Sequence, residues 1–113
     1  MINNMEKEIT FVDITSVNDL PAGKTKKFTI DNNDILLANV DGKIYAVDDM
    51  CTHEDSSLSL GCLKGELVYC TLHGSRFNVR TGKPIEEPAT EALQRYQVRI
   101  QNDRIEVSIN SIK

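Results

Sequence analysis

Alternating apolar and polar positions predict two strands in the C-terminal third of the chain. Over residues 95–100 and 105–109 every second residue is aliphatic or aromatic, and Asn102-Asp103 lies between the two segments. A period of two puts alternate side chains on opposite faces of a sheet. We therefore expect an antiparallel pair of strands that turns at Asn102-Asp103.

The first half of the chain predicts four more strands. They cover residues 8–14, 24–30, 35–40 and 43–47. Asp41-Gly42 is a strong signal for a tight hairpin between the last two strands, and Asn32-Asn33 is expected to turn the chain before them. Ser16 is placed to cap one short helical turn. No segment has the period of a long helix.

Residues 48–84 lose this alternation and are rich in Ser, Asp, Gly and Cys. Only residues 66–69 and 75–79 look extended, with a turn over 80–84. We therefore expect an all-β fold in one domain, residues 1–113. In it, an antiparallel sandwich or barrel base, about residues 8–47 and 85–110, carries a small inserted β subdomain, about residues 48–84.

Both histidines and two of the three cysteines fall in two short segments of this middle region. Cys51-Thr52-His53 is followed, after sixteen residues, by Cys70-Thr71-Leu72-His73. Thiolates and imidazoles are soft or borderline metal ligands, so the two segments indicate one metal site. Structural zinc usually uses Cys pairs two to four residues apart. A zinc site is therefore a weaker alternative, as are ordinary loop histidines beside buried thiols.

The spacing C-x-H, sixteen residues, C-x2-H resembles that of the Rieske [2Fe-2S] proteins, in which two imidazoles replace two thiolates. The resemblance extends to Gly74, Phe77 and the turn Thr81-Gly82-Lys83, and to Tyr45-Ala46-Val47 upstream. It covers most of the chain. It implies a Rieske-like fold whose inserted subdomain binds the cluster.

The ligands follow from the resemblance residue by residue. It implies one [2Fe-2S] cluster per chain, with Cys51 and Cys70 on one iron and His53 and His73 on the outer iron. Thr71 stands where proline is common in the family. This change removes a fixed backbone angle but no ligand.

Ser75 and Phe77 are expected to tune the reduction potential. In the high-potential Rieske proteins of cytochrome bc-type complexes, a serine and a tyrosine after the second histidine donate hydrogen bonds to sulfur, and a disulfide is also present. Here Ser75 is kept, Phe77 replaces the tyrosine, and Ser56 and Leu72 occupy the disulfide positions. The chain thus resembles the soluble Rieske ferredoxins, and we expect a potential in the lower half of the Rieske range.

Four carboxylates flank the first segment, at Asp48, Asp49, Glu54 and Asp55. One interpretation is an ordinary solvated loop. The other is a negative rim that opposes the addition of an electron and steers a basic partner towards the site.

Charge and composition restrict the partners. Thirteen basic against seventeen acidic residues give a net charge of −4, which argues against nucleic acid as the main partner. Residues 1–8 lack the apolar stretch of a signal peptide, and the longest aliphatic run is only Ile35-Leu36-Leu37-Ala38, so no membrane segment is expected. With two cysteines assigned to metal, Cys62 has no disulfide partner, which suits the cytoplasm. We expect Cys62 to be an inert thiol, with redox sensing as the alternative.

The predicted function is one-electron transfer rather than catalysis. The chain has no third histidine for a mononuclear oxygenase iron and no Gly-rich dinucleotide turn. The resemblance implies a monomeric ferredoxin that takes electrons from a flavoprotein reductase and passes them to a terminal oxygenase or another redox enzyme. The alternatives are a small Rieske subunit of a larger enzyme, resembling that of assimilatory nitrite reductase, and a redox-sensing binding module.

Overall fold

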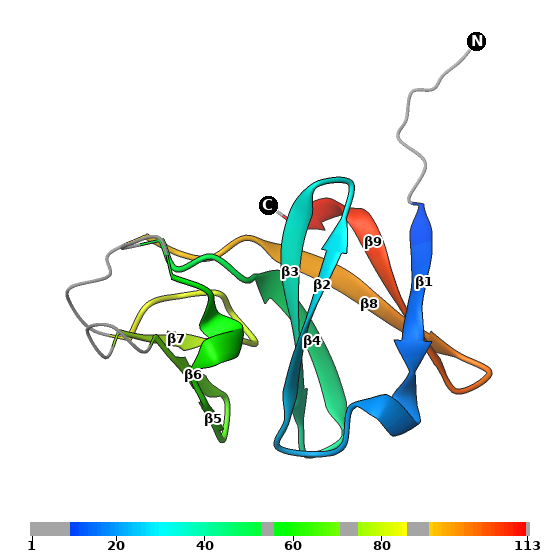
Figure 1. Cartoon of the computed structure of the whole chain (residues 1–113), viewed down its shortest axis with the longest axis horizontal. Coiled ribbons are helices and arrows are strands. Elements are labelled where there is room, and N and C mark those ends of the chain that lie inside the picture. The colour runs from blue at the N-terminus through cyan, green and yellow to red at the C-terminus, as the bar shows by residue number, and fades with distance from the viewer. Residues whose placement is uncertain (1–9, 53–55, 71–74, 86–90, 113) are drawn as a thin grey trace, which may run out of the picture.

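A computed structural model describes residues 10–52, 56–70, 75–85 and 91–112, and antiparallel strands dominate them (Figure 1). The elements are β1 (Phe11–Ser16), η1 (Val17–Asp19), β2 (Thr25–Ile30), β3 (Asn33–Val40), β4 (Lys43–Asp48), η2 (Leu58–Leu60), β5 (Leu63–Lys64), β6 (Leu67–Tyr69), β7 (Arg76–Asn78), β8 (Arg95–Gln101) and β9 (Arg104–Ile112). The two η elements are single 3-10 turns. The expected all-β class is confirmed.

Two antiparallel sheets make up the fold. The larger sheet has the strand order β1-β9-β8-β4-β3-β2, and the small sheet has the order β5-β6-β7. The larger sheet curls towards a barrel, and the small sheet stands beside it at one end of the molecule (Figure 1). The long connections that follow β4 and precede β8 run between the two sheets.

Strand β3 is buried on both faces, which explains the longest aliphatic run in the sequence. Ile35 and Leu37 pack into a core inside the curled sheet, with Ile105 among its members. Leu36 and Ala38 point the other way, into a second core shared with the small sheet. A strand covered on both faces reads as a continuous apolar run rather than as an alternation.

Two of the expected turns are confirmed in position and geometry. Asp41-Gly42 and Asn102-Asp103 both have positive φ angles, 52° and 96° in the first pair and 52° and 64° in the second. The expected turn at Asn32-Asn33 is wrong by one residue. Asp31 and Asn32 have the positive φ angles, since Asn33 already pairs with Ile30 in the ladder between β2 and β3. Asp and Asn tolerate this conformation better than other residues with a side chain.

The helical turn after Ser16 is also confirmed. It is η1, and the backbone N–H of Asn18 donates to the Ser16 Oγ at 3.1 Å. In the described part of the chain, no helix has the length and apolar character needed to cross a membrane.

Candidate metal centre

Cys51 and Cys70 are buried in the same core. Cys51 follows β4 by three residues and Cys70 follows β6 directly, and their side chains are 3% and 2% exposed. Both belong to the apolar cluster that fills the space between the two sheets. No disulfide joins them. Two segments distant in sequence thus contribute one buried thiol each to the same part of the molecule.

The two loops that carry these thiols close in the same way. In the first loop, residues 51–56, the N–H of Cys51 donates to the carbonyl oxygen of Ser56 at 2.9 Å. In the second loop, residues 70–75, the N–H of Cys70 donates to the carbonyl oxygen of Ser75 at 2.7 Å. Each cysteine therefore sits at the base of a six-residue loop.

The tips of both loops lie outside the described residues. They contain His53 and His73, the two expected imidazole ligands, and also Glu54 and Asp55. The assignment of the histidines to the outer iron stays a prediction. The negative rim expected at Glu54 and Asp55 likewise stays a prediction.

Asp49 is not part of a solvated rim, which corrects one expectation for this residue. Its side chain is 0% exposed, and its carboxylate accepts hydrogen bonds from the Ser57 hydroxyl and from the N–H of Ser59, the latter at 2.9 Å. Its carbonyl oxygen accepts from the N–H of Leu58 at 2.7 Å, and its own N–H donates to the carbonyl of Asp34 at 3.0 Å. Asp49 joins the first loop to η2 and to β3.

Asp48 is paired as well. The Tyr96 hydroxyl donates to the Asp48 carboxylate at 2.7 Å. Burial raises the pKa of the Tyr96 phenol, and the hydrogen bond and the charge of Asp48 raise it further. The bond fastens β8 to β4 where the two strands pair at only two positions, Ala46 with Tyr96 and Val47 with Arg95.

Residues 91–94, here called the strap, tie the first loop to the small-sheet side. The Thr52 hydroxyl donates to the carbonyl of Glu91 at 2.7 Å. The N–H of Leu93 donates to the carbonyl of Gly82, also at 2.7 Å. Gly82 has a φ of +80°, and a Cβ there would lie 2.5 Å from the Leu93 carbonyl oxygen. Only glycine fits this contact, and the alternation of residues did not reveal it.

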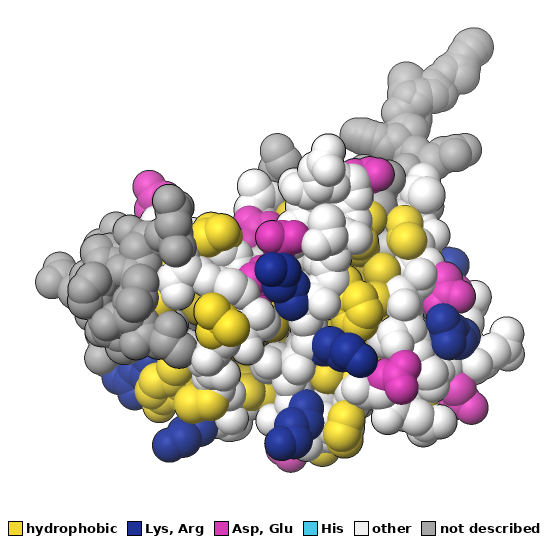
Figure 2. Space-filling model, viewed as in Figure 1, with side chains coloured by type: hydrophobic (Ala, Val, Ile, Leu, Met, Phe, Trp, Pro, Cys, Tyr) yellow, Lys and Arg dark blue, Asp and Glu magenta, His cyan; other side chains and the backbone are white. Residues whose placement is uncertain are grey.

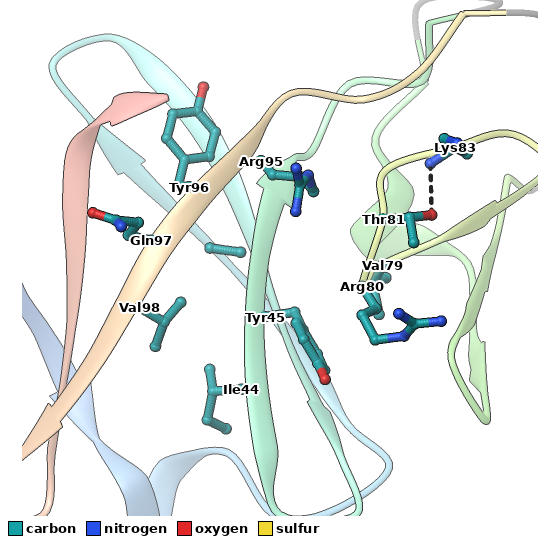
Figure 3. Close-up of a pocket in the computed structure, with 11 residues that line it drawn as sticks. Ile44, Tyr45, Val79, Arg80, Thr81, Lys83, Arg95, Tyr96, Gln97 and Val98 are labelled. Carbon is teal, nitrogen blue, oxygen red and sulfur yellow. Dashed lines mark hydrogen bonds between the residues drawn. The ribbon is translucent and has the colours of Figure 1, made fainter. Parts of the chain in front are cut away.

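A groove of about 590 Å³ separates β4 and β8 from the turn at residues 79–83 (Figure 3). Its basic residues are Arg80, Lys83 and Arg95. Figure 3 shows Tyr45 on the β4 side and Arg80 on the side of the turn, and the Arg80 guanidinium lies 3.3 Å from the Glu66 carboxylate. Of the expected ligands that the structure describes, neither Cys51 nor Cys70 lines the groove. Its cations contrast with the net charge of −4. Figure 2 shows both Lys or Arg and Asp or Glu side chains on one face of the molecule.

The described residues fit an iron-sulfur group. Two buried thiols supply the soft donors that it needs. Ser75 is 0% exposed, and its Oγ has no hydrogen-bond partner among the described residues. A buried hydroxyl normally has a partner, and a sulfur atom held beside Cys70 would provide one. Phe77, also 0% exposed, belongs to the same core and has no hydroxyl to donate.

Comparison with known proteins gives a family match and close relatives. A family model described as the Rieske [2Fe-2S] domain matches residues 10–97. The ferredoxin component of a naphthalene 1,2-dioxygenase system from Pseudomonas putida is 32% identical over 102 residues, covering 90% of this chain and 98% of the relative. The biphenyl dioxygenase ferredoxin subunit of Pseudomonas sp. (strain KKS102) is 40% identical over 94 residues, covering 82% and 86%.

One solved structure is also similar to this chain. It is described as a complex of reduced oxygenase and oxidized ferredoxin in carbazole 1,9a-dioxygenase. One of its chains superposes on this chain with a TM-score of 0.87 at 28% identity. The superposition covers 91% of this chain and 96% of that one.

Proposed function

The chain belongs to the Rieske [2Fe-2S] family, and from this membership we propose that it carries single electrons from a flavoprotein reductase to the terminal oxygenase of a dioxygenase system. The observation that carries the proposal is the pair of buried thiols in one core. Ser75, whose carbonyl accepts from the N–H of Cys70, adds a buried hydroxyl that has no partner among the described residues. The family relatives at 32% and 40% identity are ferredoxin components, which are carriers rather than catalysts.

The proposed ligands are Cys51 and Cys70 on one iron and His53 and His73 on the other. When bound, the [2Fe-2S] cluster supplies one-electron redox chemistry, with Rieske potentials of about −150 to +300 mV. The apolar core around the two cysteines keeps water from the thiolate side. The Ser75 hydroxyl is available to donate a hydrogen bond to sulfur, which favours the reduced state.

The partner is proposed from the enzyme systems to which the relatives belong. The two ferredoxin relatives belong to naphthalene and biphenyl dioxygenase systems, and the solved ferredoxin is in complex with its oxygenase. The net charge of −4 favours a basic docking surface on the partner. These relatives favour a separate carrier over the two alternatives, a fixed subunit of a nitrite reductase-like enzyme and a redox-sensing module.

We place the carrier in the cytoplasm. Cys62 is exposed and forms no disulfide. An exposed thiol suits a reducing compartment. The expected monomeric state is part of the same proposal.

Electron delivery is the direct test of this function. The chain is reduced with dithionite, freed of excess reductant, and mixed in a stopped-flow instrument with the oxidised oxygenase components of a naphthalene and a biphenyl dioxygenase. We expect at least one oxygenase to be reduced by one electron per chain, at a rate that falls with salt. If both oxygenases stay oxidised while the carrier stays reduced, the proposal that the chain delivers electrons to a dioxygenase is wrong.

A further inference from the structure

A fully buried carboxylate lies two residues before the first cysteine, and the proposed electron transfer gives it no role. Asp49 is among the largest fully buried side chains of the described residues, and the others are apolar. Carboxylates are almost never fully buried unless they are paired. Within the described ranges, the partners of the Asp49 carboxylate are the Ser57 hydroxyl and the backbone N–H of Ser59.

We propose that Asp49 is a positioning residue of the cluster site, which fixes the first loop and thereby holds Cys51 in place. The inference rests on the proposed function, because it assumes that Cys51 holds an iron. It concerns how this loop is built, beyond the identity of the ligands.

The positioning follows from the hydrogen bonds that converge on one residue. The Asp49 carboxylate holds Ser57 and Ser59, and its carbonyl holds the N–H of Leu58 between them. The N–H of Asp49 binds the carbonyl of Asp34. Asp49, which precedes the first loop, is thereby joined to η2, which follows the loop, and to β3 of the larger sheet. A loop held at both ends keeps Cys51 in place when no metal is bound.

Four variants test this role. Asp49→Asn keeps the shape and an acceptor, and Asp49→Ala removes the anchor. Ser57→Ala keeps the Asp49 side chain and removes one of its hydrogen-bond partners. Asp13→Asn is the matched control, because Asp13 is an exposed carboxylate at the edge of the larger sheet, paired with Arg104 at 3.0 Å. The reduction potential, the half-life of bound iron in a chelator and the thermal midpoint of the cluster-free chain are measured for each.

We expect Asp13→Asn to leave the reduction potential and the half-life of bound iron unchanged. Asp49→Ala and Ser57→Ala should lose iron several-fold faster than the native chain, and Asp49→Asn should lie closer to native. Native iron retention and a native potential in both Ser57→Ala and Asp49→Ala would overturn the proposal. If Asp49→Ala does not fold, Asp49→Asn and Ser57→Ala carry the test. A native chain without iron would instead overturn the proposed function.

Discussion

Gly61 lies against Tyr69 so closely that a Cβ at position 61 would be 1.8 Å from the Tyr69 carbonyl oxygen. The contact is with backbone, directly before Cys70, and cannot be relieved by turning a side chain. We therefore expect Gly61→Ala to displace the start of the second loop, to cost about 1–3 kcal/mol in the free energy of unfolding, and to reduce bound iron. Urea unfolding and iron analysis measure both effects.

Gly65→Ala is the control for this substitution. A Cβ at Gly65 meets nothing within 4 Å, and only its φ of +61° is unfavourable. Its expected cost is about 1 kcal/mol, with native iron content. Similar stability and iron content in the two variants would show that the contact between Gly61 and Tyr69 does not matter.

Ser75→Ala should lower the reduction potential without weakening the cluster-free fold. The Ser75 Oγ has no acceptor among the described residues, so its removal breaks no known hydrogen bond within the chain. A hydrogen bond to a cluster sulfur, in contrast, would be lost, and the reduced state would be less stable. A redox titration measures the shift, with Ser56→Ala as the matched change in the first loop. An unchanged potential would mean that the hydroxyl does not contact the cluster.

Phe77→Tyr should raise the potential at a cost in stability. Phe77 has no exposed surface and shares its core with both cysteines. An added hydroxyl must find an acceptor in that core, and a cluster sulfur is the expected one. Without the cluster, the buried hydroxyl should cost about 1–3 kcal/mol. Potentials and urea unfolding of the cluster-free chain test both halves, and a lowered or unchanged potential would contradict the first.

The raised pKa of the Tyr96 phenol predicts a loss of stability at high pH. Burial and Asp48 favour the protonated phenol in the folded chain, while the unfolded chain has the ordinary pKa of about 10. The contribution is therefore complete below about pH 10 and is lost as the pH rises from there towards the folded-state pKa.

Tyr96→Phe isolates this contribution. At about pH 8 the variant should be about 1 kcal/mol less stable than the native chain, because the hydrogen bond to Asp48 at 2.7 Å is gone. The difference should shrink above about pH 10. Urea unfolding across this range checks it. A difference that is constant with pH would show that the phenol ionises equally easily in both states.

The sequence predicted the larger sheet well because its signals are local. Turns at Asp41-Gly42 and Asn102-Asp103 depend on residues that tolerate positive φ, and both are where expected. The two-residue strand β5 is too short to show a period, and η2 depends on Asp49, nine residues earlier, for its hydrogen bonds. Neither could be predicted from the local pattern.

The two candidate cysteines could be identified from the sequence, but the residues that support them could not. Cys51 and Cys70 stood out by spacing, and the structure places both in one core. From the sequence, Asp49 looked like a member of an acidic loop. Its burial depends on the fold and not on the neighbouring residues in the sequence. The contact of Gly82 with the strap could not be predicted from the sequence either, because its partner Leu93 is eleven residues further along the chain.

Electron paramagnetic resonance of the dithionite-reduced chain is the most direct test of the central claim, that one [2Fe-2S] cluster is held by Cys51, Cys70, His53 and His73. We expect a reduced-state signal with a lower average g value than that of all-cysteine [2Fe-2S] clusters, and we expect Cys51→Ser or His73→Ala to abolish or change it. A folded chain free of iron, or an all-cysteine spectrum that persists in His73→Ala, would contradict the account.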